Sequence, residues 1–180
     1  KLSETNVCLT FDDSLKCQYD VAVPILEEMN IKAFFFVYTS IFTANPGMLE
    51  IYRYFRMNFY NTVNNFYDDF FKVFNKHHNQ NLEKICKEHK NQIEKVKKDY
   101  LHLSYYDIKF RLVRDDILTK DEYSQIMIKM FEKKNFDYNS IIKNLFLSKN
   151  DLKQLRQNGH IIGLHSHSHP LILENLNYEK

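Results

Sequence analysis

The sequence predicts a mainly helical α/β fold in which two strand-and-helix segments flank a helical insertion. The chain of 180 residues holds only 3 Gly and 3 Pro, which argues against a loop-rich all-β fold. Short apolar runs of strand length occur near the start of the chain and again near residue 161. Between them, aromatic residues recur at helical spacing. We therefore expect a first α/β segment at 1–44, the insertion at 45–147 and a continuation of the α/β part at 148–180.

The first segment predicts a strand, a helix and a second strand. Residues 7–11 (Val-Cys-Leu-Thr-Phe) form a short β-rich run that stops at an Asp-Asp pair. Apolar residues at 20–29 recur at helical spacing, and Pro24 stands early in this helix, where proline is tolerated. Residues 33–37 (Ala-Phe-Phe-Phe-Val) have no polar break, which is typical of a parallel strand covered on both faces. A unit of this length is a βαβ crossover.

The middle segment predicts amphipathic helices. One aromatic stripe covers residues 52–74 and a second apolar stripe covers residues 82–103, and each predicts one long helix. Thr119 and Glu122 have the spacing of a capping box and predict the start of another helix. Such stripes could also line a ligand pocket, but we expect them to pack the helices against one another.

The last segment returns to an α/β pattern. Ser148 and Asp151 predict a helix start, and Gly159 fits the position just after the end of that helix. Residues 161–164 then predict a strand, which leads directly into a histidine-rich run.

Composition excludes several classes of function. The formal net charge is +2, so charge gives no reason to expect nucleic acid as the partner. We expect no transmembrane segment, because no apolar stretch approaches the length that crosses a bilayer. The 3 Cys residues form no CxxC pair and predict no disulfide framework. No signal peptide is visible, and the cysteine pattern slightly favours the cytoplasm.

Candidate metal ligands follow two of the predicted strands. In parallel α/β folds, functional side chains gather where strands end. Asp12 and Asp13 follow the first strand, and His165 and His169 follow the last. One carboxylate and two histidines would bind a zinc-like ion with one position left for water, and the second carboxylate would take the proton of that water. Each motif alone also fits a helix cap, a turn or an exposed loop.

Both motifs resemble those of the polysaccharide deacetylases with the NodB homology domain (carbohydrate esterase family 4). The family's first motif is Thr-Phe-Asp-Asp-Gly, and residues 10–14 read Thr-Phe-Asp-Asp-Ser. Its second motif is His-(Ser/Thr)-x-x-His, usually preceded by Gly-His-Glu-Ile-Gly and followed by Pro. Residues 159–170 read Gly-His-Ile-Ile-Gly-Leu-His-Ser-His-Ser-His-Pro. Residues 24–37 also resemble the family's helix and its Ala-Thr-Phe-Phe-Val strand.

The resemblance, which covers roughly residues 5–44 and 148–175, implies a fold and a set of roles. The fold is part of a deformed (β/α) barrel of the NodB-homology type, interrupted by the helical insertion. Asp12 matches the catalytic base, and Asp13, His165 and His169 match the ligands of a divalent metal ion, Zn²⁺ first and Co²⁺ or a similar ion as an alternative. The implied reaction is hydrolysis of N-acetyl or O-acetyl groups on a sugar or polysaccharide, so the implied partner is an acetylated glycan or sugar.

Several features depart from the family or match it more loosely. Ser14 replaces the family's glycine. His160 matches a structural position, and His167 falls at a variable position for which we expect a role other than ligation. The family's later Arg-Pro, Asp-Trp and Leu-x-His motifs are not found, so we expect either the N-terminal part of a longer enzyme or a degenerate remnant.

Other functions remain open on the sequence alone. One is a non-catalytic metal-binding remnant or a partner-binding module. Another is a related amidohydrolase of the deformylase type that acts on a sugar. For the insertion at 45–147 we expect a cap over the substrate groove or a docking surface for a protein partner.

Overall fold

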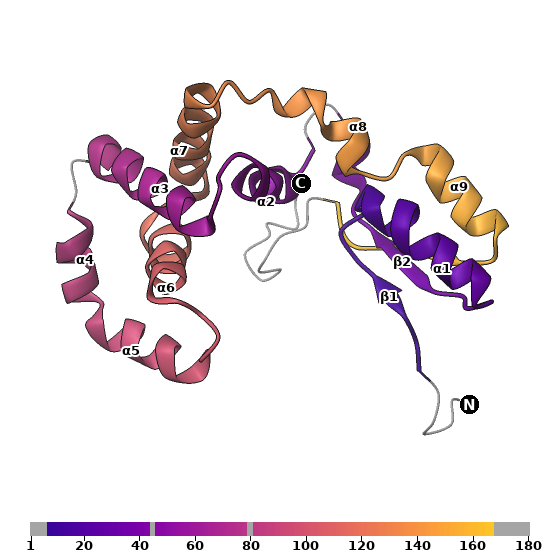
Figure 1. Ribbon diagram of the computed structural model, residues 1–180, viewed down its shortest axis with the longest axis horizontal. Coiled ribbons are helices and arrows are strands. Elements are labelled where there is room, and N and C mark those ends of the chain that lie inside the picture. Colours follow the sequence, from indigo (N-terminus) through magenta and orange to yellow (C-terminus); the bar gives the residue numbers. More distant parts are fainter. Residues whose placement is uncertain (1–6, 44–45, 79–80, 168–180) are drawn as a thin grey trace, which may run out of the picture. The chain divides into compact units, whose positions relative to one another are not determined.

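A computed structural model of the chain describes residues 7–43, 46–78 and 81–167 (Figure 1). The chain forms two compact units, one of residues 1–51 and 138–180 and the other of residues 52–137. The elements of the first unit are β1 (Thr10–Phe11), the π-helix η1 (Gln18–Ala22), α1 (Val23–Glu28), β2 (Phe34–Val37), the 3-10 helix η2 (Thr39–Phe42), the 3-10 helix η4 (Tyr138–Ser140), α8 (Ile142–Leu145), α9 (Lys149–Gln157) and β3 (Ile161–Leu164).

The second unit is helical. Its elements are α3 (Val63–His78), α4 (Leu82–Glu88), α5 (Lys90–Asp99), α6 (Tyr105–Leu112), the π-helix η3 (Val113–Ile117) and α7 (Lys120–Lys133), while α2 (Leu49–Asn58) begins in the first unit and continues into the second. The fold is thus α/β and mostly helical, as predicted. No helix in the described ranges combines the length and apolar character needed to cross a membrane.

Three parallel strands form an open sheet in the order β1-β2-β3. Thr10 pairs with Phe34, and the longer pairing of β2 with β3 ends at Val37 and Leu164. The predicted strand at 161–164 is confirmed, and the one at 33–37 is confirmed except for its first residue. The predicted strand at 7–11 is too long, because only its last two residues pair with β2 and Val7 is 88% exposed.

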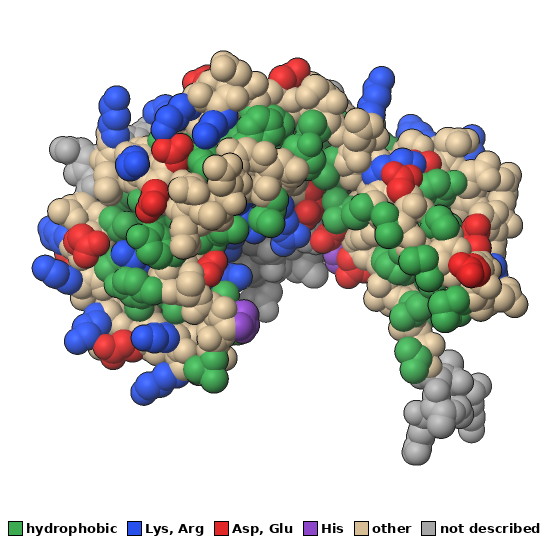
Figure 2. All heavy atoms as spheres, viewed as in Figure 1, with side chains coloured by type: hydrophobic (Ala, Val, Ile, Leu, Met, Phe, Trp, Pro, Cys, Tyr) green, Lys and Arg blue, Asp and Glu red, His purple; other side chains and the backbone are tan. Residues whose placement is uncertain are grey.

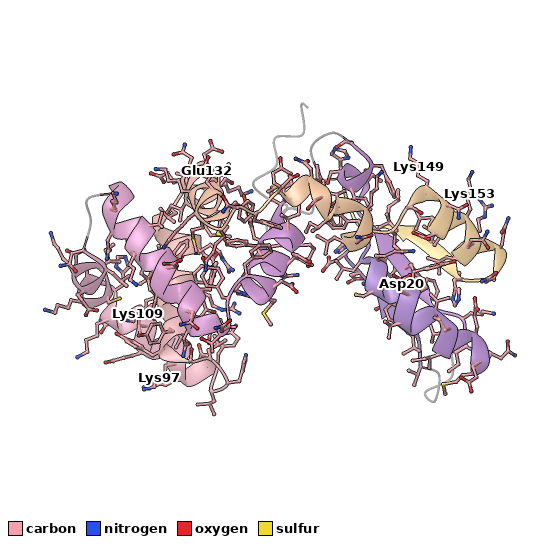
Figure 3. All side chains as sticks on the ribbon, turned by 45° about the horizontal axis from the view of Figure 1, so that its top comes forward. Asp20, Lys97, Lys109, Glu132, Lys149 and Lys153 are labelled. Carbon is pink, nitrogen blue, oxygen red and sulfur yellow. The ribbon has the colours of Figure 1, made fainter. Side chains whose placement is uncertain are left out.

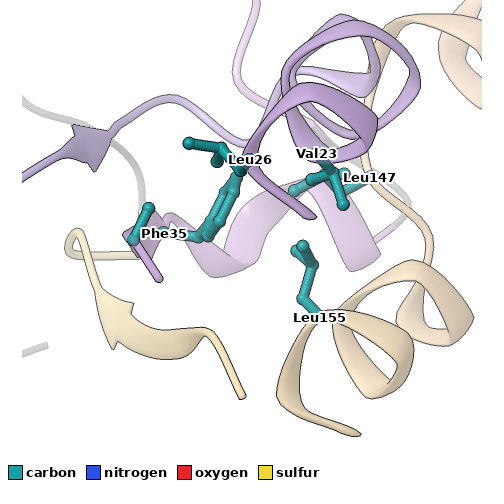
Figure 4. Packing of buried hydrophobic residues seen from close by; sticks show 6 residues of the cluster. Val23, Leu26, Phe35, Leu147 and Leu155 are labelled. Carbon is teal, nitrogen blue, oxygen red and sulfur yellow. The ribbon is translucent and has the colours of Figure 1, made fainter. Parts of the chain in front are cut away.

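Two helices cover one face of this sheet and form the core of the first unit. Phe35 of β2 belongs to one buried cluster with Val23 and Leu26 of α1 and with Leu147 and Leu155 (Figure 4). These five side chains are all less than a tenth exposed, and Leu155 is fully buried. The predicted helix at 20–29 is confirmed only in part, because the chain begins as a π-helix and continues as an α-helix.

The other face of the sheet is less covered than the sequence predicts. Phe34 and Phe36 stack on each other with ring centroids 6.2 Å apart, and both are half-buried. On β3, Ile161 is 51% exposed and Leu164 is 79% exposed. The expectation that the strand at 33–37 is covered on both faces is thus met only in part, because one face of β2 is buried and the other is half-buried.

Among the described residues, capping boxes begin three helices. The predicted capping box at Thr119 and the predicted helix start at Ser148 are confirmed, and the start at Ser148 is also a capping box. Gly159 follows α9 as predicted, with a left-handed backbone (φ 87°). A third box at Ser104 and Asp107 begins α6, a helix for which the sequence analysis made no prediction. In each box the side-chain oxygen accepts a backbone N–H that the helix itself leaves without a partner.

The aromatic stripe at 52–74 packs helices against one another, as predicted. Phe55, Phe66, Phe70 and Phe74 are all buried, and Phe66 and Phe70 both contact the ring of Phe110 on α6. Aromatic pairs of this kind stabilise a core beyond the area they bury.

Each predicted long helix is instead two shorter ones. The stripe at 52–74 breaks between α2 and α3, where the Thr62 hydroxyl oxygen accepts the N–H of Asn65 and provides a new helix start. The stripe at 82–103 breaks at His89, whose Nδ1 lies 3.0 Å from the Ile85 carbonyl oxygen. A side chain that bonds to the backbone in this way competes with continued helix.

Charges of both signs are mixed over the surface. In Figure 2, basic and acidic side chains are interspersed over the visible face of the helical unit. On α9, Lys149 and Lys153 are exposed, one helical turn apart (Figure 3). The mixture on this face agrees with the near-neutral net charge.

Candidate functional site

The turn after β1 carries Asp12 and Asp13 in a strained backbone. Asp13 and Ser14 are both left-handed, with φ of 69° and 58°. This conformation costs a residue other than glycine about 1–2 kcal/mol, so surrounding contacts must hold it. Ser14 therefore adopts, at the position of the family's glycine, the conformation that glycine adopts most easily.

Ser14 is buried and ties this turn to two neighbouring segments. Its hydroxyl oxygen accepts the N–H of Tyr38 at 3.3 Å, just after β2, and its carbonyl oxygen accepts the N–H of Leu147 at 2.9 Å. The next residue, Leu15, forms an isolated antiparallel bridge with Phe146. The first motif is thus fixed between the end of β2 and the segment that leads into α9.

The turn after β3 is held to β2 in a similar way. The N–H of His165 donates to the carbonyl oxygen of Val37 at 2.8 Å, which extends the strand pairing by one bond. Ser166 follows with a left-handed backbone, φ 64°. Both strand ends that carry the motifs therefore hold strained residues, which is common at functional sites.

These two turns bring Asp13 and His165 together. Asp13 Oδ1 lies 3.8 Å from His165 Nε2, and the two side chains are 23% and 36% exposed. A carboxylate and an imidazole that face each other at the carboxyl ends of parallel strands, with access to solvent, are donors of the type that zinc-like ions take. The pair fits as two of the ligands of such an ion.

The other two predicted site residues are not placed in the same group. Asp12 is exposed, and its carbonyl oxygen accepts a hydrogen bond from the Gln18 side-chain amide. His169 lies outside the described residues. Within 7–43, 46–78 and 81–167, no three His, Cys, Asp or Glu side chains form a group that could hold a metal ion. The roles of Asp12 and His169 therefore stay predictions.

A salt bridge next to the first motif links it to α9. Lys16 Nζ lies 2.9 Å from Asp151 Oδ1 and 3.2 Å from Asp20 Oδ1. Burial by itself would raise the pKa of Asp151, but hydrogen bonds from Lys16 and Ser148 hold it below its ordinary value. The ionised pair therefore joins the chain after Asp13 to the helix before β3.

The remaining histidines of the second motif have structural contacts. His160 is 3% exposed, and its Nδ1 accepts the N–H of Ala33 at 3.2 Å. Burial, and to a lesser degree the charge of Lys32, lower the pKa of His160. His167 Nδ1 lies 2.8 Å from the hydroxyl oxygen of Thr39. Sequence analysis did not single out Thr39, because only the pairing of β2 with β3 brings it to this loop.

The fold and the site together define an α/β protein with a carboxylate and an imidazole at the carboxyl edge of a parallel sheet. A family model described as "Polysaccharide deacetylase" matches residues 1–99, so the chain belongs to the polysaccharide deacetylase family. This is a family of carbohydrate deacetylase hydrolases that are typically metal-dependent. The matched range contains the first motif and not the second. No curated protein and no solved structure matches the chain.

Proposed function

We propose that this chain is the metal-binding part of a deacetylase that hydrolyses N-acetyl or O-acetyl groups on a sugar or polysaccharide. The observation that carries the proposal is the approach of Asp13 to His165 from two different strand ends, inside a chain of this family. In this proposal the three strands are part of a deformed (β/α) barrel, and Asp13, His165 and His169 hold a divalent ion, Zn²⁺ or a similar one.

In the proposed reaction the ion acts as a Lewis acid and a side chain of the protein acts as the general base. A bound divalent ion supplies Lewis-acid polarisation of the acyl oxygen and a lower pKa for nearby water. Asp12 is exposed beside Asp13 and accepts the proton of the attacking water as general base. In this proposal the two neighbouring carboxylates have different roles: Asp13 binds the ion and Asp12 takes the proton.

Zinc titration of the metal-stripped chain by calorimetry tests the site. We expect one-to-one binding that Asp13→Ala and His165→Ala abolish. His102→Ala is the matched control, because His102 is an exposed histidine of the helical unit and its loss should leave zinc binding unchanged. Zinc binding that persists unchanged in both Asp13→Ala and His165→Ala would refute the site.

Acetate release from an acetylated chito-oligosaccharide tests the reaction. Asp12→Asn should keep zinc affinity and lower the rate about 10²–10⁴-fold, the usual contribution of a general base. Zinc binding without acetate release would favour the alternative, a non-catalytic metal-binding module. Release of formate in place of acetate would favour a deformylase-type amidohydrolase.

A further inference from the structure

The segments after β2 and β3 stay hydrogen-bonded beyond the ends of the two strands. The N–H of Thr39 donates to the carbonyl oxygen of Ser166 at 3.3 Å, and the N–H of Ser40 donates to the carbonyl oxygen of His167 at 2.9 Å. These bonds connect the 3-10 helix η2 to the loop that carries His165. The loop is therefore held to its neighbour through its backbone.

One side-chain bond joins the same two segments. Thr39 Oγ1 and His167 Nδ1 share a hydrogen bond of 2.8 Å. The bond fixes the imidazole of His167 through the nitrogen nearer to its own backbone, so it also fixes the backbone from which the ring projects. It is a side-chain link, in addition to the backbone bonds, between the segment after β2 and the loop after β3.

The loop needs such support because its conformation is strained. Ser166 stands between His165 and His167 with φ 64°, a backbone conformation that costs a serine about 1–2 kcal/mol. The side chain of His165 is 36% exposed, so part of it is in contact with solvent. The bonds on either side of Ser166 are the contacts that oppose the strain.

We propose that Thr39 and His167 are positioning residues for the metal site. Their hydrogen bond keeps the loop in the conformation in which His165 Nε2 faces Asp13, and His167 is not itself a ligand. This inference rests on the proposed function, since it assigns the two residues a role in metal affinity at that site.

Zinc affinity of substituted chains, measured by calorimetry on the same chain, tests the proposal. Thr39→Val and His167→Ala should each weaken zinc binding about 10-fold or more, the usual effect of losing a residue that supports a metal ligand. The double variant should lose little more than either single variant, because both remove one bond. Thr39→Ser keeps the hydroxyl and should bind zinc like the unaltered chain.

Two further variants separate positioning from ligation and from general damage. His167→Asn places an amide where Nδ1 stood and has no atom at Nε2, so it should retain zinc affinity if His167 only positions the loop. Thr43→Val is the matched control, because the Thr43 hydroxyl donates to the Ser40 carbonyl oxygen at 2.7 Å within its own segment. Its zinc affinity should be unchanged, and the thermal midpoints of the metal-free variants should stay close to one another.

The outcomes distinguish the inference from the function it rests on. Zinc binding by Thr39→Val that equals that of the unaltered chain would overturn the positioning role and leave the proposed function standing. Loss of zinc binding in His167→Asn as complete as in His165→Ala would make His167 a ligand and overturn the inference as well. Absence of zinc binding by the unaltered chain would overturn both.

Discussion

Replacing His160 with asparagine should remove a defined part of the acid sensitivity of folding. His160 is 3% exposed, and its Nδ1 accepts the N–H of Ala33, so the ring is neutral and carries its proton on Nε2. A second proton, on Nδ1, would make that nitrogen a donor facing the N–H of Ala33, and it would place a charged imidazolium in the core. This agrees with the lowered pKa of His160, which burial causes first and the charge of Lys32 second.

The sign and the size of the pH-dependent change in folding stability follow from the difference in proton binding between the folded and unfolded chain. The unfolded chain takes up a proton as the pH falls through the ordinary histidine pKa of about 6.5, while the folded chain does not until the pH is lower. The stability that neutral His160 contributes is therefore present above the unfolded pKa and is lost as the pH falls below it. Between pH 7.5 and 5.5 the loss reaches up to about 1.4 kcal/mol, since one unbound proton corresponds to about 1.4 kcal/mol per pH unit.

Urea unfolding at pH 7.5 and 5.5, in buffer with a chelator, measures this loss. Amide exchange of β3 adds a probe that belongs to the first unit. His160→Asn keeps an oxygen that can accept the N–H of Ala33, so it should remain folded and lose up to about 1.4 kcal/mol less than the unaltered chain. His102→Asn, the control in the helical unit, should behave like the unaltered chain. An equal loss of stability in His160→Asn and the unaltered chain would refute the reasoning.

Substitutions at three further positions have expected outcomes in unfolding experiments. Ser14→Gly and Ser14→Ala both lose the hydrogen bond from the N–H of Tyr38, but only glycine relieves the left-handed backbone strain. In urea unfolding, Ser14→Gly should therefore be about 1 kcal/mol more stable than Ser14→Ala. Equal stabilities of the two variants would contradict the strain. Gly163→Ala brings a Cβ to 2.5 Å from a ring carbon of Phe36 and should cost about 1–3 kcal/mol, which an unchanged thermal midpoint would disprove. Leu155→Ala empties a fully buried position and should cost about 2–5 kcal/mol, and a smaller loss of urea stability would mean that the core refills the space.

The sequence predicts those parts of the fold that depend only on residues close together in the chain. The capping boxes at Thr119 and Ser148 and the left-handed Gly159 each depend on residues within one or two turns. The strand at 161–164 was visible for the same reason, as an apolar run between turn residues. The breaks of the long helices were missed because the apolar stripe continues across them, while one polar side chain at Thr62 or His89 redirects the backbone.

The sequence predicts which residue types make up the candidate site, but it does not predict the hydrogen bonds that hold the turns of the site in place. Asp13 and His165 were predicted from the motifs, and the structure brings them to 3.8 Å. The contacts of Ser14 with Tyr38, and of Thr39 with His167, depend on which strands pair and in which register. A single sequence does not contain that information, because partners far apart in the chain leave no periodic pattern.

The pairing of β2 with β3 also has a consequence for how the protein is made. β2 precedes β3 by about 120 residues, and at about 5–20 residues per second the ribosome needs about 6–24 s to synthesise that length. During this interval the Phe34–Val37 strand has a vacant edge, and its aromatic side chains form the kind of apolar, β-prone segment that associates with other chains. The helical unit lies between β2 and β3 in the chain, so all of it is synthesised before β3. Yield in the cell should therefore depend on chaperones that bind nascent chains more than on the stability of the finished fold.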